Sequence, residues 1–173
     1  MLFLSALLFG LAQQPIEATE CVNFSVPNEQ RAQIGEAILE RRPKDAATSA
    51  ALSKATDDCA RQHRWSAARA LNANGFAAMR MAAEAAARQL GYPEWADIAL
   101  ATVRERSPAQ RENLANTGTG AAEFELVLMR MVHQDRRIAS TIQSSDAAYM
   151  EKFVLMVKLL AVAEVERDQA LAS

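Results

Sequence analysis

The sequence contains few of the residues that build loop-rich or disulfide-rich folds. Its 173 residues include six glycines, five prolines and two cysteines. These numbers exclude a collagen-like chain and a small scaffold held by many disulfides. Aromatic residues make up only 6% of the chain, and alanine is the most common residue. A core of this composition depends on close contacts between helices more than on large rings.

The chain also lacks an excess of basic charge and a long apolar run. Lys and Arg number 19 against 21 Asp and Glu, which gives a formal net charge of −2. A general nucleic-acid binder needs a net basic surface, so we expect no nucleic-acid partner. The longest apolar run, Met1–Ala12, is shorter than the roughly 18–20 residues of a membrane-spanning helix. We therefore expect no stable membrane span.

Motifs that would fix a reaction are absent from the sequence. There is no Cys-x-x-Cys-His, no His-Glu-x-x-His, no phosphate-binding glycine loop and no Gly-x-Ser-x-Gly. Neither of the two histidines follows a glutamate by three residues, which excludes the usual carboxylate-bridged di-iron pattern. The sequence therefore predicts a protein that is not an enzyme and that carries no cofactor.

The N-terminal residues are typical of a secretory signal peptide. The apolar run has the right length, and Gly10 and Ala12 are small residues at suitable cleavage positions, with a second possible cleavage after Ala18. No Lys or Arg precedes the apolar run, so a buried N-terminal segment is the alternative. We predict a signal peptide over residues 1–18 and a periplasmic or secreted mature protein.

The two cysteines agree with export. Cys21 follows the predicted cleavage region, and Cys59 lies in a helical pattern. In an oxidising compartment an even pair is most simply interpreted as one disulfide. The alternative is two unrelated buried thiols. We predict a Cys21–Cys59 bridge.

The rest of the chain has helical periodicity and no sustained alternation with period two. We expect an extended tether over residues 19–27, and then an all-α, single-domain bundle of about six or seven helices over residues 28–173. Asn28, Ser66 and Ser145 are the expected N-caps. Residues 72–75 either break a helix or form a weak stretch within one. The long C-terminal helices are expected at 121–138 and 145–170.

Most charged residues of the helices are interpreted as solvated surface. Glu164 and Glu166 fit an exposed helix face, and Arg80, Glu84 and Arg88 form a ladder with four-residue spacing.

Sulfur and imidazole occur together at one place on a predicted helix. Met129 and His133 are four residues apart and therefore share a face. Thioether and imidazole are suitable ligands for Cu(I) in an exported protein, so this pair is a candidate soft-metal site. Methionine is more often a core residue, which is the alternative interpretation.

The last helix is apolar on two sides. One stripe contains Phe153, Val157 and Leu160, and a second stripe contains Leu155, Leu159 and Val162. The second stripe either makes the helix central in its bundle or forms a seam for another chain. We predict a seam that binds a protein partner or a second copy. The predicted function is therefore protein–protein contact, and the alternative is a bundle that binds a small ligand or copper.

Overall fold

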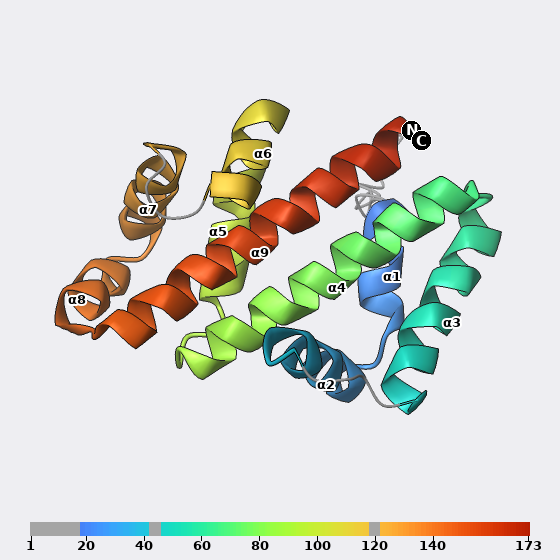
Figure 1. Cartoon of the computed structure of the whole chain (residues 1–173), viewed down its shortest axis with the longest axis horizontal. Coiled ribbons are helices and arrows are strands. Elements are labelled where there is room, and N and C mark those ends of the chain that lie inside the picture. The colour runs from blue at the N-terminus through green and yellow to red at the C-terminus, as the bar shows by residue number, and fades with distance from the viewer. Residues whose placement is uncertain (1–17, 42–45, 118–121) are drawn as a thin grey trace, which may run out of the picture.

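A computed structural model describes residues 18–41, 46–117 and 122–173, and within these ranges every regular element is helical (Figure 1). The all-α prediction is confirmed. The described ranges contain nine α-helices, however, in place of the six or seven expected. In chain order the elements are η1 (Ala18–Glu20), α1 (Cys21–Ser25), α2 (Asn28–Leu39), α3 (Ala46–His63), α4 (Ala67–Gln89), α5 (Trp95–Arg104), α6 (Pro108–Thr117), α7 (Ala122–Gln134), α8 (Arg137–Ser144) and α9 (Ala147–Ala172).

Two long helices form the centre of the molecule. Helices α4 and α9 run side by side in opposite directions (Figure 1), and their contact is the most extensive between any two elements. Helices α1, α2 and α3 pack against α4, while α5 and α6 pack against α9. Helices α7 and α8 lie at the far end, where α7 contacts α5 and α6. In this view no other described helix crosses in front of α9 (Figure 1).

Alanine allows α4 to sit close to its neighbours. Ala83, Ala86 and Ala87 belong to a core cluster shared with α5, α7 and α9, and Ala73 and Ala77 belong to a second cluster shared with α1, α2 and α3. Because alanine loses no rotamer freedom and extends little from the backbone, it permits this two-sided packing of one helix.

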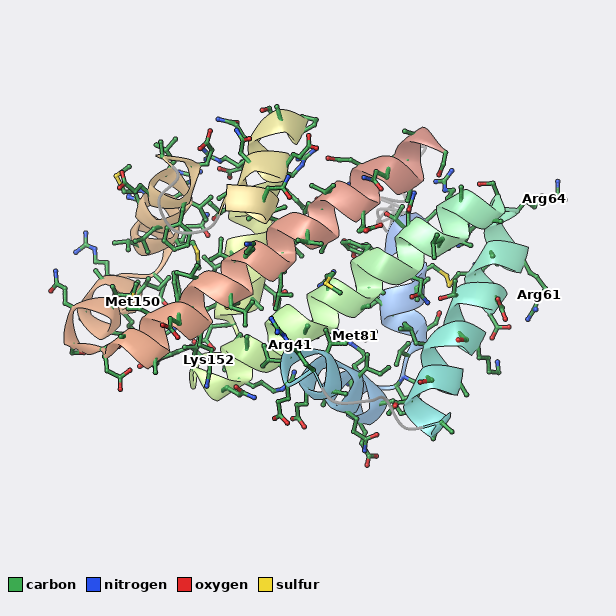
Figure 2. The ribbon with its side chains drawn as sticks, in the orientation of Figure 1. Arg41, Arg61, Arg64, Met81, Met150 and Lys152 are labelled. Carbon is green, nitrogen blue, oxygen red and sulfur yellow. A yellow bond between two sulfur atoms is a disulfide. The ribbon has the colours of Figure 1, made fainter. Side chains whose placement is uncertain are left out.

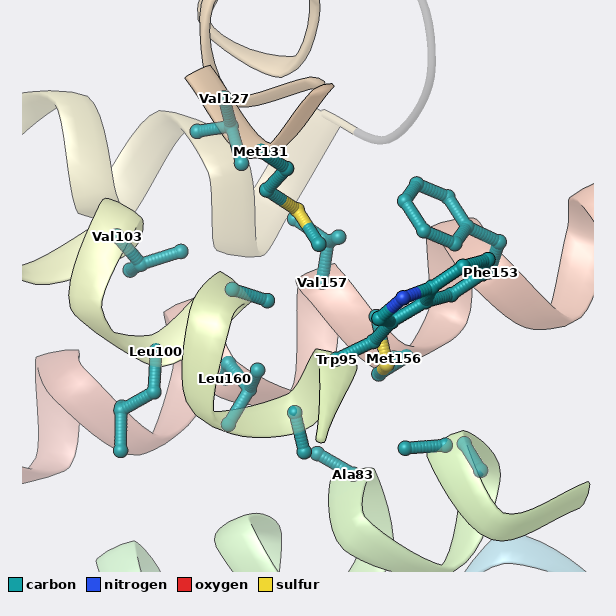
Figure 3. Packing of buried hydrophobic residues seen from close by; sticks show 14 of the residues in the cluster. Ala83, Trp95, Leu100, Val103, Val127, Met131, Phe153, Met156, Val157 and Leu160 are labelled. Atoms are coloured by element: carbon teal, nitrogen blue, oxygen red, sulfur yellow. The ribbon is translucent and has the colours of Figure 1, made fainter. Parts of the chain in front are cut away.

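The larger cluster contains the buried aromatic side chains Trp95, Phe124 and Phe153. Trp95 is fully buried and meets the edge of Phe153, with ring centroids 5.9 Å apart. Figure 3 shows Trp95 beside Phe153 and Met156, with Met131 reaching toward the same region from α7. Phe153 belongs to the main stripe predicted for the last helix, and its members Phe153, Val157 and Leu160 are all buried, which confirms that part of the prediction.

Several helix ends follow the expected chemistry. The Ser66 hydroxyl accepts a hydrogen bond from the Arg69 backbone N–H, which confirms it as the N-cap of α4. Gly91 adopts a positive φ of 86° directly after α4 and so allows the chain to turn away. Helix α4 runs unbroken through residues 72–75.

The other two expected N-caps differ from the prediction. Pro27 takes the N-cap position that was expected for Asn28. The Asp146 carboxylate takes the position expected for Ser145 and accepts a hydrogen bond from the Tyr149 backbone N–H.

Residues 19–27 are not an extended tether. They form η1 and α1, and Val22 and Val26 are buried in the cluster beside α3 and α4. A helix of five residues is too short to give a visible apolar period, which is why the sequence pattern did not reveal it. Of the predicted signal peptide over residues 1–18, residues 1–17 lie outside the described part of the chain. Ala18 is described and begins η1.

The helix expected over residues 121–138 is divided in two at Asp135. The Asp135 carboxylate accepts hydrogen bonds from the Arg137 backbone N–H at 2.9 Å and from the Trp95 indole at 3.1 Å. These bonds end α7 and start α8 in a new direction. The pKa of the Asp135 carboxyl lies well below its ordinary value, chiefly because the Arg137 side chain donates hydrogen bonds to it.

A chain of ion pairs ties η1, α4, α5 and α9 together. Glu164 is fully buried and accepts from Arg104 Nε at 2.9 Å. Arg104 also donates to Glu20, which in turn pairs with Arg80 at 3.4 Å. Burial disfavours the charged form of Arg104, but the attraction of Glu164 and the hydrogen bonds to both glutamates outweigh this and raise its pKa. The interpretation of Glu164 and Arg80 as solvated surface was therefore wrong.

Cys21 and Cys59 form a disulfide that joins α1 to α3. Their sulfur atoms are 2.07 Å apart and their Cα atoms 6.0 Å apart, so the predicted bridge is confirmed. Cys59 is buried beside Leu52 and Ala55 in the second core cluster. The bridge closes a sequence separation of 38 residues, which corresponds to about 4 kcal/mol in the chain-entropy model of disulfide stabilisation.

Candidate interaction face

The outward side of α9 carries the second predicted stripe. Leu155 is 38% exposed, and Leu159 and Val162 are half-buried. At 100° per residue the three side chains lie within about 60° of one another around the helix, so they form one apolar strip. Leu159 also packs against the edge of the main core cluster. The strip is therefore anchored on the core below it while one edge is open to solvent.

Charged residues border this apolar strip, which we call the α9 strip (Leu155, Leu159 and Val162). Glu151 and Lys158 lie on one side of it, and Lys152, labelled in Figure 2, lies on the other. Within the described part of the chain, Glu151 and Lys158 make no ion pair or hydrogen bond with another residue. Two opposite charges without partners beside exposed apolar surface resemble the polar rim of an interaction surface.

The buried side of α9 explains why the strip is held in a fixed place. Glu164, Phe153 and Leu160 point into the protein and are almost completely buried. The ion pair of Glu164 with Arg104 fixes the position of α9 along its length, and the Tyr149 hydroxyl donates to the Leu90 carbonyl at 3.1 Å near the start of the helix. A rigid helix loses little conformational entropy when its free side binds another surface.

A second apolar surface lies on α7 and α8. Leu126 and Met129 are 43% and 61% exposed. Beside them is an open recess of about 300 Å³ between the two helices. Its lining residues are mostly apolar, and they come from α7 and α8: Leu128, Met129, Val132, Ala139, Ile142 and Gln143.

The recess includes one of the two residues of the predicted soft-metal pair. Met129 lines it, whereas His133 is exposed one turn further along α7 and is not part of the lining. Among the described residues, no three His, Cys, Asp or Glu side chains come close enough to hold a metal ion. The mostly apolar lining around Met129 suits an apolar group, and the Met129–His133 metal pair stays a prediction.

Comparison of the chain with known proteins gave no matching family model, no matching curated protein and no matching solved structure. Across the residues described here, none of the helices is both long enough and apolar enough to cross a membrane.

The sequence predicted the α9 strip, but two features of the surroundings were missed. The recess between α7 and α8 depends on the break at Asp135, and no helical periodicity marks that position. The buried ion pairs beneath α9 join residues that are 60 and 84 apart in sequence. The only sequence signal for them is a glutamate placed among apolar residues, Ala161, Ala163 and Val165.

Proposed function

We propose that this protein acts through protein–protein contacts made by the α9 strip, and that it has no catalytic activity. The observation that carries the proposal is exposed Leu155 on a firmly anchored helix, beside two charges, Glu151 and Lys158, that have no partner among the described residues. Full burial of an exposed leucine is worth about 1.5–3 kcal/mol, and covering the 38% of Leu155 that is still exposed supplies a part of this as binding energy.

We further propose that the protein is exported to the periplasm or secreted. The apolar N-terminal run and the position of Cys21 soon after the predicted cleavage region support this proposal. The disulfide supports it independently, because disulfides persist in oxidising compartments and are rare in the cytosol.

The second candidate function is the binding of a small apolar ligand in the recess between α7 and α8. The exposure of Met129 and the apolar lining favour it, since methionine adapts its shape to different ligands. At about 300 Å³ the recess is at the lower limit of ligand pockets, which makes it the weaker candidate. Copper bound by Met129 and His133 belongs to this second candidate.

Native mass spectrometry of protein purified from its own cells after mild crosslinking tests the proposal. We expect a dimer or a stoichiometric protein complex, because the α9 strip is then covered. The mature mass is expected to lack the leader. A monomer that retains a small-molecule or copper mass would instead support the second candidate. A bare monomer would contradict both candidates.

A further inference from the structure

From the charges beside the α9 strip we infer that its partner is a second copy of this chain, bound with the two α9 helices antiparallel. The inference rests on the proposed function, and it names the partner and the register. Its basis is the placement of Glu151 and Lys158 relative to Leu155, together with the absence of a partner for either charge among the described residues.

The two charges lie on the same side of the strip. Seven residues correspond to 700° around a helix, so Glu151 and Lys158 differ by only about 20° in direction and lie about 10.5 Å apart along the axis. The midpoint between them falls beside Leu155. Glu151 therefore lies about 6 Å from Leu155 along the axis in one direction and Lys158 about 4.5 Å in the other, so one charge of each sign flanks the most exposed residue of the α9 strip.

A two-fold axis converts this placement into self-complementarity. In an antiparallel helix pair related by such an axis, each side of one helix faces the same side of the other, with the chain directions reversed. An axis beside Leu155 therefore sets Glu151 of each copy against Lys158 of the other, which gives two identical ion pairs. The two Leu155 side chains meet between them.

The other arrangements of two copies fit less well. In a parallel two-fold pair, the side of one helix that carries Glu151 and Lys158 faces the other side of its partner, where Lys152 and Leu159 lie. Lys158 then meets a leucine and has no opposite charge, whereas the antiparallel pair gives both Glu151 and Lys158 an ion-pair partner. In the antiparallel register, Lys152 on the opposite side lies near Leu159 of the other copy. Its aliphatic stem can cover that leucine while its ammonium group stays in water.

The surface that this contact covers is modest. The segment from Glu151 to Val162 is about 18 Å long at 1.5 Å per residue. One helix face of this length gives an interface at the small end of the specific range, so we expect a dissociation constant on the order of micromolar. At such an affinity, each ion pair has a measurable effect on the equilibrium.

Sedimentation velocity between about 1 and 200 μM tests the inference with four proteins: the wild type, Glu151→Lys, Lys158→Glu and the double charge swap. We expect the wild type to dimerise and each single reversal to weaken the dimer at least tenfold, because it creates two like-charge contacts. The double swap is expected to restore dimerisation. Mixing the two single variants is also expected to restore it, since every contact then joins opposite charges. Glu29→Lys, an exposed change of equal charge on α2, serves as the control.

Three results would overturn the inference. A wild type that stays monomeric across this range excludes the second copy. Single reversals that dimerise as well as the wild type exclude the ion pairs, as does a double swap that fails to recover. If the wild type is monomeric and yet crosslinks through position 155 to a different protein, the second copy is excluded while the proposed function stands.

Discussion

Replacing Arg104 by methionine is expected to lower the free energy of unfolding by about 3–5 kcal/mol. Arg104 holds the fully buried carboxylate of Glu164 and also donates to Glu20. Removing the guanidinium takes away one of the two charged partners that Glu164 has among the described residues, and Arg167 on the same helix remains as the other. Arg167 compensates only part of the buried charge, and a buried carboxylate that loses a partner costs far more than the ion pair contributes on balance.

Chemical denaturation with a matched control measures this effect. Arg130 forms an ion pair with Glu105 at 3.3 Å in which both side chains are about half exposed, so Arg130→Met should cost less than about 1 kcal/mol. The double variant Arg104→Met, Glu164→Met is expected to be more stable than Arg104→Met alone, because it removes the stranded charge. Equal, small losses for Arg104→Met and Arg130→Met would show that Glu164 is solvated.

Replacing Gly35 by alanine is expected to destabilise the fold by about 1–3 kcal/mol, although alanine is the better helix former. Gly35 lies where α2 crosses α4. A Cβ atom there would sit 2.2 Å from the Met81 carbonyl oxygen and 2.7 Å from its carbonyl carbon. Both are backbone atoms of a long helix, so the two helices must separate to admit the methyl group.

Gly75→Ala in α4 provides the comparison, measured by thermal melting. Its Cβ would meet only the end of the Glu166 side chain, at 3.0 Å, and a flexible side chain can move aside. We expect Gly75→Ala to leave the melting temperature unchanged or to raise it, since the helix gains about 1 kcal/mol in propensity. Similar effects of the two substitutions would contradict the close crossing of α2 and α4.

The sequence was most informative where apolar residues repeat over several turns. The buried stripe of α9 could be predicted because Phe153, Val157 and Leu160 recur at helical spacing. The α9 strip was predictable for the same reason. The pattern did not decide whether the second stripe of α9 is buried, because helices that are apolar on two sides occur both in cores and at interfaces.

Features that depend on contacts distant in sequence could not be predicted. Arg80 and Glu164 are charged residue types that usually lie on the surface. Arg80 is mostly buried because η1 brings Glu20 to it, and Glu164 is buried because α5 brings Arg104 to it. The break at Asp135 depends on the Trp95 indole, which comes from another helix. Local propensity cannot represent either effect, since tertiary contacts override it.

The central claim is that the α9 strip is an interface and not part of the core. The double variant Leu155→Glu, Leu159→Glu tests it most directly, with light scattering and thermal melting on the same sample. Leu155→Glu alone is the milder companion, because Leu159 also touches the core. Leu71→Glu, at a leucine that is 72% exposed on α4, is the control. We predict that both strip variants are monomers with a cooperative melt and unchanged helicity, while the wild type and the control associate. A monomeric wild type, together with the loss of the cooperative melt in Leu155→Glu, would contradict the claim.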